Sequence, residues 1–476
     1  EYDAVIVGSG PNGLAAAITM AREGLSVLVL EAAFSVGGGT RSAELTLPGF
    51  VHDVCSAIHP FYGSSPFFRR EPLEKFGLEW IHPPAAMAHP LDDGTAIMLE
   101  NSIETTSEGL GFDGAAYSKL MRPLAADWAK IAPQILGPFR FPHHPLAMAR
   151  FGFNAVQSAR GLATRFFRGD RARALVAGLA AHSMLDIRRS PTASIALVLA
   201  ALAHTDGWLL VKSGSGQLAR AMATALQSYG GKIETGHKVQ SMSDIPSARA
   251  TLFDLTPRQI VQIAGDTLPG RYRRQLSKYR YGPGVFKIDW ALDGPIPFRA
   301  EGCGRAATEH VGGTIDEIIQ SESEVISGQH PECPFVILAQ QSLFDSTRAP
   351  EGKHTAWAYC HVPHGSIFDM TGRIEAQVER FAPGFTDRII RRHVMNPADF
   401  QAYNANYIGG DINGGIMDWG QLFTRPTWSL TPYRIPVRGL YVCSSSTPPG
   451  GGVHGMCGFR AARTALHDMF NIDIEI

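Results

Sequence analysis

The sequence predicts an α/β fold with a discontinuous, Rossmann-like dinucleotide-binding domain and an inserted α+β domain. Two glycine-rich motifs lead to this expectation: G-x-G-x-x-G at residues 8–13 and a glycine run at residues 450–455 of the 476-residue chain. The first motif lies between a short apolar run and an alanine-rich segment, the order of a dinucleotide-binding strand, turn and helix. The long interval between the two motifs leaves room for a second domain.

The first unit begins with an apolar, β-branched run at residues 4–7, which indicates a buried parallel strand. Gly8 allows the tight turn, Gly10 lets the backbone approach a pyrophosphate, and Gly13 lets the helix pack closely on the strand. The segment 14–23 then predicts a helix whose N-terminus presents N–H groups and a positive dipole end to phosphates.

An acidic residue follows at the spacing expected of a ribose ligand. Gly24 ends the first helix, and residues 25–30 predict a second strand that leads into Glu31. Glu31 stands 18 residues after Gly13, close to the interval of about 20 residues at which such an acid binds a ribose hydroxyl. Because a carboxylate disfavours a 2′-phosphate, NADP is not expected at this site.

A second glycine loop at residues 36–42 favours FAD over NAD. A simple NAD dehydrogenase has no need of the triplet Gly37-Gly38-Gly39, whereas a longer ligand needs a second place where the backbone lies flat against it. Arg41 in the same loop offers a fork of donors to phosphates.

The C-terminal segment predicts a second contact with the same cofactor. Residues 439–443 predict a strand, small residues follow, and residues 455–470 predict a helix. The helix dipole would face the pyrimidine part of a flavin, where negative charge gathers on reduction. The residues expected to contact FAD are Gly8, Gly10, Pro11, Asn12, Gly13, Glu31, Gly37, Gly38, Gly39, Thr40, Arg41, Val239, Ser444, Ser445, Gly452, Val453 and His454.

The middle of the chain divides between the two domains. Residues 217–229 follow a sequence that formally matches G-x-G-x-x-A, and we interpret them as a crossover helix rather than a second dinucleotide site. A strand at 233–239 would follow, with the backbone of Val239 near the adenine. The cofactor domain is expected to comprise residues 1–70, 212–270 and 432–476, and the substrate domain residues 71–211 and 271–431.

The substrate domain combines two kinds of segment. Residues 71–211 look mainly helical and rich in aromatic side chains, and residues 271–431 look like strands and turns with two helical stretches. The segment 284–292 alternates as a half-buried strand does. Residues 139–173 hold seven arginines among six phenylalanines. They indicate either the solvated face of an amphipathic helix pair or a peripheral membrane contact beside an apolar entrance.

Composition limits the classes of partner and location. The 43 basic and 44 acidic side chains give a formal charge of −1, so no nucleic acid is expected as a partner. Six cysteines without a C-x-x-C pair favour a reducing, cytoplasmic compartment. The first strand begins at residue 4, so no leader peptide is expected within this sequence, and the apolar stretch 192–203 is too short to cross a bilayer.

The chain resembles the phytoene desaturase-like flavoproteins. The resemblance rests on residues 8–13 with Glu31, on Gly37-Gly38, and on the segments 439–443 and 449–453. Within that group it is similar to the branch of pyridine nucleotide-disulphide oxidoreductase domain-containing protein 2. The middle segments that support this branch are 305–308, 310–313, 382–385 and 421–426.

The resemblance implies noncovalent FAD in a discontinuous domain, and oxidation or desaturation of apolar, often isoprenoid-like molecules. The chain departs from the pattern of this family at two places. Ser444 occupies a position where the family usually has glycine, and the stretch between Val239 and Phe253 is short where many relatives carry a β-hairpin.

The expected reaction is hydride transfer from an apolar substrate to flavin N5, with a quinone or O₂ as the final electron acceptor. The candidates for a catalytic base are His454, His59 and Tyr62. The alternatives are a flavin amine or alcohol oxidase that uses O₂, and a flavin-bound interaction protein with little turnover.

Metal binding and a covalent flavin are two further kinds of site. No metal is expected, although Cys360, His361 and His364 lie close together in sequence, because no carboxylate is near them in the chain. Cys443 or Cys457 offers a covalent link to the flavin only if the thiol is reactive, which isolated buried cysteines rarely are.

Overall fold

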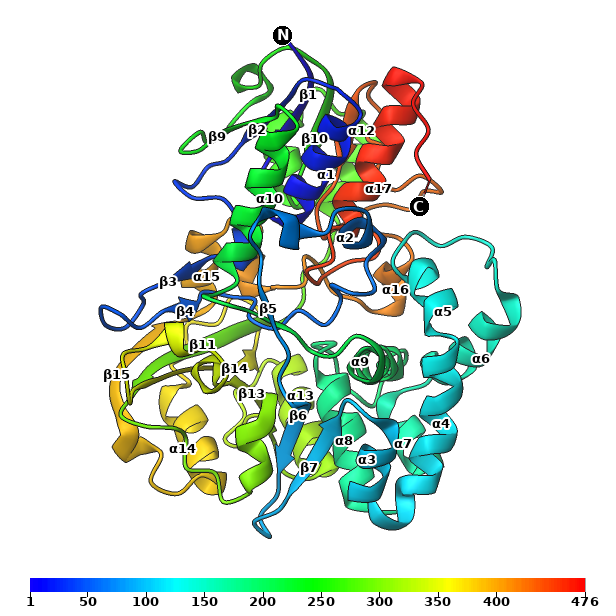
Figure 1. Cartoon of the computed structure of the whole chain (residues 1–476). Helices are drawn as coiled ribbons and strands as arrows, with labels where there is room; N and C mark the ends of the chain where they lie inside the picture. The colour runs from blue at the N-terminus through cyan, green and yellow to red at the C-terminus, as the bar shows by residue number, and fades with distance from the viewer. Residues whose placement is uncertain (476) are drawn as a thin grey trace.

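The computed structural model describes residues 1–475 and contains two main sheets (Figure 1). The first is a five-stranded sheet in the order β16-β10-β1-β2-β9, and all of its pairs are parallel. Its strands are β1 (Tyr2–Val7), β2 (Val27–Leu30), β9 (Lys232–Glu234), β10 (Ala248–Phe253) and β16 (Leu440–Val442). Three separate stretches of chain therefore build one sheet, and both ends of the chain lie beside it in Figure 1.

Helices cover both faces of the parallel sheet. One face packs on α1 (Pro11–Arg22), α10 (Gly216–Ser228) and α17 (Met456–Ala465), and the other packs on α11 (Pro257–Ala264) and α12 (Gly270–Ser277). This explains why β1, β2 and β10 are almost entirely apolar: a parallel strand buried on both faces has no polar side.

The helices α1 and α17 are in close backbone contact although more than four hundred residues separate them. A Cβ atom on Gly458 of α17 would collide with the backbone oxygen of Asn12 in α1. The missing side chain therefore lets the C-terminal helix start beside the first glycine turn.

The second sheet has seven strands in the order β15-β11-β14-β13-β12-β6-β7. Its pairs are antiparallel except for the parallel pair β12–β6. The strands are β6 (Ala85–Pro90), β7 (Ala96–Glu100), β11 (Gly284–Leu292), β12 (Ala306–Val311), β13 (Val336–Ala339), β14 (His354–Val362) and β15 (Ile389–Met395). Two short pairs, β3 (Ser42–Ala43) with β4 (His52–Asp53) and β5 (Trp80–Ile81) with β8 (Leu210–Val211), lie outside both sheets.

A group of helices packs against the second sheet and beside it. These are α3 (Ile103–Gly109), α4 (Gly114–Ala126), α5 (Trp128–Ile135), α6 (Pro145–Ala155), α7 (Ala159–Phe166), α8 (Asp170–Ala181), α9 (Ala193–Thr205), α13 (Ile315–Ile326) and α14 (Thr371–Phe381). The core of α4 to α9 continues into Ile337 and Trp357 of the sheet, whereas α14 covers β11, β13 and β14. The remaining helices are α2 (Pro66–Arg70), α15 (Pro397–Tyr403) and α16 (Trp419–Leu422). Within residues 1–475, no helix combines the length and the apolar character needed to span a bilayer.

The α/β fold with a Rossmann-like unit is confirmed, and several predicted elements match closely. The helix predicted at 217–229 is α10, and the strand predicted at 284–292 is β11 with the same bounds. The helix predicted at 455–470 is α17 followed by a π-helical turn.

Three expectations about elements were wrong. The strand predicted at 233–239 ends at Glu234, because Gly236 takes a left-handed φ of 70° and turns the chain. The strand β11 is buried on both faces rather than half-buried, because α14 covers one face and the charged side chains of Lys287 and Asp289 pair with each other on the other. Residues 271–431 hold more than two helices, whereas residues 71–211 are mainly helical as expected, with strands between residues 80 and 100.

Candidate active site

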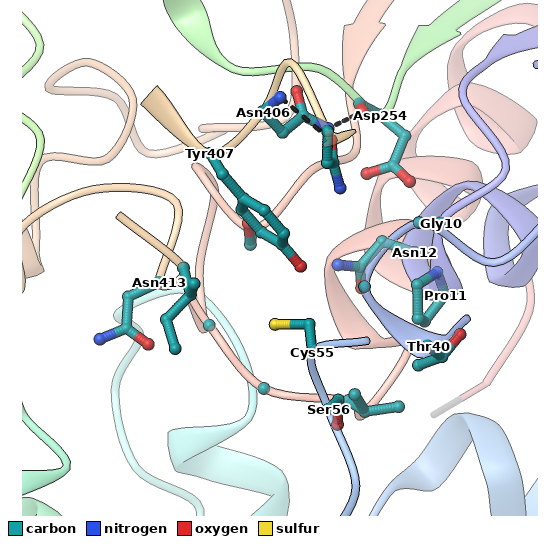
Figure 2. Close-up of a pocket in the computed structure, with 18 of the residues that line it drawn as sticks. Gly10, Pro11, Asn12, Thr40, Cys55, Ser56, Asp254, Asn406, Tyr407 and Asn413 are labelled. Atoms are coloured by element: carbon teal, nitrogen blue, oxygen red, sulfur yellow. Dashed lines mark hydrogen bonds between the residues drawn. The ribbon is translucent and has the colours of Figure 1, made fainter. Parts of the chain in front are cut away.

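One large cavity of about 620 Å³ has walls from both main sheets. It extends from the glycine turn after β1 to side chains of β12, β13 and β14, and cavities of this size hold cofactors and substrate-sized ligands. Figure 2 shows how its wall gathers the turn at Gly10, the segment at Cys55, the end of β10 at Asp254, and the segment from Asn406 to Asn413.

The first glycine turn forms one end of the cavity. Gly8 has a φ of 104°, a left-handed conformation that suits glycine, and a Cβ on Gly10 would lie 2.6 Å from the carboxylate of Asp254. Pro11 is the first residue of α1, and the first turn of this helix has neither a side-chain cap nor an acidic side chain. Asn12 adds a buried Oδ1 atom without a hydrogen-bond partner. Gly13 N in this turn is bonded to the carboxylate of Asp254, so the start of α1 is only partly open to an anion.

Glu31 lies on the same wall, but its acceptor positions are already used within the protein. Its carboxylate accepts hydrogen bonds from the backbone and hydroxyl of Ser9 at 2.9 and 2.6 Å, from Ala33 N at 2.8 Å and from Arg41 at 3.1 Å. A carboxylate has about four acceptor sites, so a ribose hydroxyl must share or displace one of these donors. Arg41 in turn stacks over the ring of Tyr403 at 5.4 Å.

The second glycine loop packs directly on the first. Gly37 has a φ of 119°, and its N–H donates to Ser9 O at 3.0 Å. A Cβ on Gly38 would lie 3.0 Å from the Cα of Gly10, and a Cβ on Gly39 would collide with the hydroxyl of Tyr407. The triplet is therefore required by close packing, against backbone at Gly38 and against a side chain at Gly39.

Asp254, which follows β10, is a wall residue that sequence analysis missed. Its carboxylate accepts a hydrogen bond from Gly13 N at 3.0 Å, and its backbone oxygen accepts one from Asn406 Nδ2 at 2.9 Å (Figure 2). Burial, with a smaller contribution from the charge of Glu31, raises the pKa of Asp254 to about 7. At neutral pH a substantial fraction of this carboxyl group is uncharged, which suits a position beside a phosphate site.

The segment at residues 402–413 closes the cavity from the other side. Tyr403 donates its hydroxyl to Gly38 O at 2.7 Å, and Asn406 accepts from Thr256 N at 2.9 Å. Tyr407 and Asn413 lie on the wall in the same view as Asn12 (Figure 2).

The C-terminal glycine run contributes the wall residues Ser445, Gly451, Gly452 and Val453. Ser444 is turned away from the cavity, because its hydroxyl donates to Leu255 O at 2.7 Å and only 2% of the residue is exposed. The serine that departs from the family pattern therefore places no side-chain atom in the cavity.

The inner end of the cavity, at the second sheet, is apolar and aromatic. It is lined by Ile195, Val198 and Leu199 of α9, by Trp208, and by Ile337, Trp357 and Tyr359 of the sheet. The polar residues His182 and Thr308 also lie at this end. The acidic residues of the cavity wall, Glu31 and Asp254, lie at the opposite end.

None of the three candidates for a catalytic base lines the cavity. His454 accepts from Met456 N at 3.0 Å through Nδ1 and contacts Gly450 O at 3.2 Å through Nε2. His59 is hydrogen-bonded to Ser215 at 2.9 Å, and Tyr62 donates to Glu74 at 2.9 Å. Each side chain has a structural partner, and burial lowers the pKa of His454 and of His59 to about 4.

The predicted cofactor residues fall into two groups. The cavity wall includes Gly8, Gly10, Pro11, Asn12, Glu31, Gly38, Gly39, Thr40, Arg41, Val239, Ser445, Gly452 and Val453. The residues that do not reach the wall are Gly13, Gly37, Ser444 and His454. Gly13 still belongs to the turn, because its N–H holds Asp254 and a Cβ there would collide with Gly8 O.

The cysteines and the histidines considered for other chemistry lie away from the wall. Cys443 and Cys457 are buried, and burial raises the pKa of the Cys457 thiol to about 11. His361 pairs with Glu322 at 2.8 Å, and His364 is bonded to Gly282 O at 2.8 Å. All six cysteines are unpaired.

Comparison with known proteins agrees with this architecture. The model of the NAD(P)-binding Rossmann-like domain matches residues 6–69. Pyridine nucleotide-disulfide oxidoreductase domain-containing protein 2 of Rattus norvegicus is 25% identical over 99% of this chain and 94% of its own length. The limonene dehydrogenase of Castellaniella defragrans has a subunit that is 23% identical over 98% of this chain and 95% of its own length.

A solved structure extends the likeness in three dimensions. A triple mutant of putrescine oxidase with redesigned cofactor binding superposes with a TM-score of 0.63 at 19% identity, over 99% of both chains. This likeness concerns the fold alone. Because both sequence relatives align over nearly the whole chain, the resemblance inferred from the glycine motifs is confirmed.

Proposed function

We propose that this chain, an oxidoreductase of the phytoene desaturase-like type, binds one FAD along the cavity and dehydrogenates an apolar substrate at the inner end. The observation that carries the proposal is the continuity of the cavity. One wall holds the dinucleotide turn at Gly8 to Asn12, and the far wall holds Trp208 and, from the second sheet, Trp357.

The residues of the cavity fit a long dinucleotide ligand. The start of α1 lies beside the proposed place of a pyrophosphate, and Val239 lines the same cavity as Glu31, where an adenine would lie. Gly38 and Gly39 line the same cavity, so their backbone lies beside the proposed ligand. Glu31 stays the proposed ribose ligand, sharing its acceptor sites with Ser9.

The bound flavin would supply the acceptor for a hydride, and this chain supplies position and exclusion of water. Ile195, Val198 and Trp357 surround the inner end with apolar surface, so a hydrocarbon skeleton is held there by burial rather than by charge. The segment from Tyr403 to Tyr407 covers the cavity between its two ends.

An amine substrate fits this cavity less well. A protonated amine needs an acidic partner when water is excluded, and the acidic wall residues Glu31 and Asp254 lie at the dinucleotide end. We therefore favour a neutral substrate over the amine oxidase alternative.

The proposal is tested by anaerobic reduction of the purified holoenzyme. Neutral isoprenoids such as limonene and geraniol, together with putrescine as the charged comparison, are mixed with the enzyme, and flavin bleaching is followed. Bleaching by a neutral compound and not by putrescine is expected. Bleaching by putrescine alone contradicts the substrate class, and bleaching by no compound in a broad panel supports an interaction protein with little turnover.

The electron acceptor is distinguished by a second measurement. Reduced enzyme is mixed with air-saturated buffer or with a soluble quinone in a stopped-flow instrument. Faster reoxidation by quinone than by O₂ is expected for a dehydrogenase, whereas rapid reoxidation in air with peroxide release indicates an oxidase.

A peripheral membrane contact remains part of the proposal. Phe139, Phe141 and Leu146 are 78%, 86% and 83% exposed, and the ring of Phe139 contacts that of Phe423 at 5.5 Å. Trp428 and Leu430 are exposed in the same C-terminal region as Phe423. Sedimentation with vesicles, and its loss in the double variant Phe139→Ser/Phe141→Ser, tests this contact.

A further inference from the structure

Three histidines lie together near the inner end of the cavity: His89 and His310 are buried, and His182 is half-buried. His182 follows α8 and lies on the cavity wall, and its Nε2 is 2.9 Å from Nε2 of His310 on β12. His89 lies on β6, the neighbour of β12, where Glu309 pairs with Ala88 and so places His310 beside His89. The group connects the cavity with the edge of the second sheet.

The three rings are uncharged at neutral pH. Burial lowers the pKa of His182 to about 3 and that of His89 to about 4, and it holds the pKa of His310 well below its ordinary value. The neighbouring rings lower the pKa of His310 further. A neutral imidazole carries one N–H and one lone pair, so each ring is donor at one nitrogen and acceptor at the other.

The carbonyl group of Gly313 fixes the first tautomer. It can only accept, and Nε2 of His89 lies 2.6 Å from its oxygen, so Nε2 carries the proton and Nδ1 carries the lone pair. Nδ1 of His89 and Nδ1 of His310 are both buried without a partner. Both adjoin Gly178 of α8, where a Cβ would lie 3.4 Å from the former and 2.8 Å from the latter.

The same contacts indicate which ring nitrogen carries the proton in His310 and in His182. Nδ1 of His310 and Nδ1 of His89 both adjoin Gly178 without bonding to each other, so a proton on Nδ1 of His310 avoids two lone pairs on the same side of α8. Nε2 of His310 then accepts the proton of His182 Nε2. The ring nitrogen that His182 leaves for the cavity, Nδ1, is therefore a hydrogen-bond acceptor.

A hydrogen-bond donor, the hydroxyl of Thr308, lies on the same face of β12 as His310. Thr308 stands two residues before His310, so both side chains point to one side of the strand. Thr308 lines the cavity, is 2% exposed, and its Oγ1 has no hydrogen-bond partner. An acceptor and an unpartnered hydroxyl thus interrupt an otherwise apolar wall.

We propose that the inner end of the cavity selects an apolar alcohol and holds its hydroxyl group between His182 Nδ1 and Thr308 Oγ1. The alcohol donates its proton to His182 and accepts from Thr308, so both polar atoms are satisfied. This inference rests on the proposed function and narrows its substrate class.

Oxidation of the bound alcohol to a carbonyl compound removes one hydride and one proton, and each has an acceptor at this site. The carbinol hydrogen leaves as hydride with two electrons for the flavin, the hydroxyl proton passes to His182 Nδ1, and a C=O bond forms.

The test measures binding, so it does not depend on turnover. Full-length enzyme is kept reduced, and three probes are compared by equilibrium dialysis: geraniol, geranyl methyl ether and the hydrocarbon myrcene. Wild-type protein is expected to bind geraniol about tenfold more tightly than myrcene, with the ether between them because it can only accept. Equal affinity for geraniol and myrcene overturns the proposal.

Variants assign the preference to the two residues. His182→Phe and Thr308→Val each reduce the preference for geraniol and leave myrcene binding unchanged or tighter. His204→Phe is the matched control, because His204 is half-buried against Tyr117 outside the cavity, so the preference for geraniol should not change. Protein that retains flavin but shows no preference contradicts this inference alone, whereas protein without flavin contradicts the proposed function.

Discussion

Asp254 gives the cavity a property that depends on pH. Its carboxyl group is buried at the end of β10 beside Gly10 and Glu31, and its pKa is raised from 3.8 to about 7, chiefly by burial. Because the pKa in the folded protein exceeds that in the unfolded chain, the group favours folding below pH 4, and that contribution is lost as pH rises to about 7. Each pKa unit corresponds to about 1.4 kcal/mol, so holding Asp254 ionised in the folded protein costs on the order of 4 kcal/mol.

The variant Asp254→Asn removes the charge and keeps an oxygen that can accept from Gly13 N. The variant should match wild type near pH 4 and gain stability over it between pH 5 and 8, by up to about 4 kcal/mol. The assay is urea unfolding followed by tryptophan fluorescence at a series of pH values on flavin-free protein. Asp266→Asn is the control, because that side chain is fully exposed.

The same titration should affect the cofactor. An ionised Asp254 beside the proposed pyrophosphate repels it, so wild-type protein should lose flavin more readily at pH 8 than at pH 6, and Asp254→Asn should not. Parallel stability profiles for wild type and Asp254→Asn from pH 5 to 8 would refute the reasoning.

Three further changes test other parts of the structure. Glu31→Arg should lower the flavin content of purified protein at least tenfold, because it removes the acceptor of Ser9 N and adds a cation beside Arg41. Glu234→Arg is the control, because Glu234 is exposed and its replacement should leave the flavin content unchanged. Equal flavin content in both variants would contradict the role of Glu31. Gly458→Ala should push α17 away from Asn12 and reduce both thermal stability and flavin retention, whereas Gly372→Ala, in an open helical position, should be neutral. Arg348→Met should lower the free energy of unfolding by about 3–5 kcal/mol, because it leaves the buried carboxylates of Asp53 and Asp345 without their cation. A loss below about 1 kcal/mol in urea unfolding would contradict the importance of these two ion pairs.

Local motifs made part of the cavity predictable. The glycine spacing at 8–13 reports a backbone requirement that tolerates few other residues, and the structure shows the collisions that a Cβ at Gly10 or Gly13 would cause. The triplet at 37–39 is restricted in a similar way, by positive φ at Gly37 and Gly38 and by the atoms that a Cβ at each position would meet. Such positions admit few residues other than glycine, so the local sequence carries the signal.

Residues brought to the cavity by tertiary contacts gave no such signal. Tyr403 ends a short helix and Asn406 follows it, more than three hundred residues after the first turn, and no motif marks them. His182 follows α8, so its place on the wall depends on how that helix packs on the second sheet. Asp254 had the clearest missed signal, because an acid directly after a buried parallel strand lies at the ligand-binding edge of such a sheet.

Histidine roles were the least predictable feature. His454 is adjacent to the C-terminal glycines, and this made it the preferred base, yet its ring caps the start of α17 through Met456 N. Proximity in sequence to a cofactor motif does not determine on which side of the backbone a side chain lies.

The most direct test of a flavin clasped by both ends of the chain is the visible absorption spectrum of the purified protein, recorded before and after incubation with excess FAD and desalting. We expect the two visible bands of an oxidised flavin, in stoichiometric amount, and release of the pigment when the protein is denatured. A protein that stays colourless after this treatment would contradict the account.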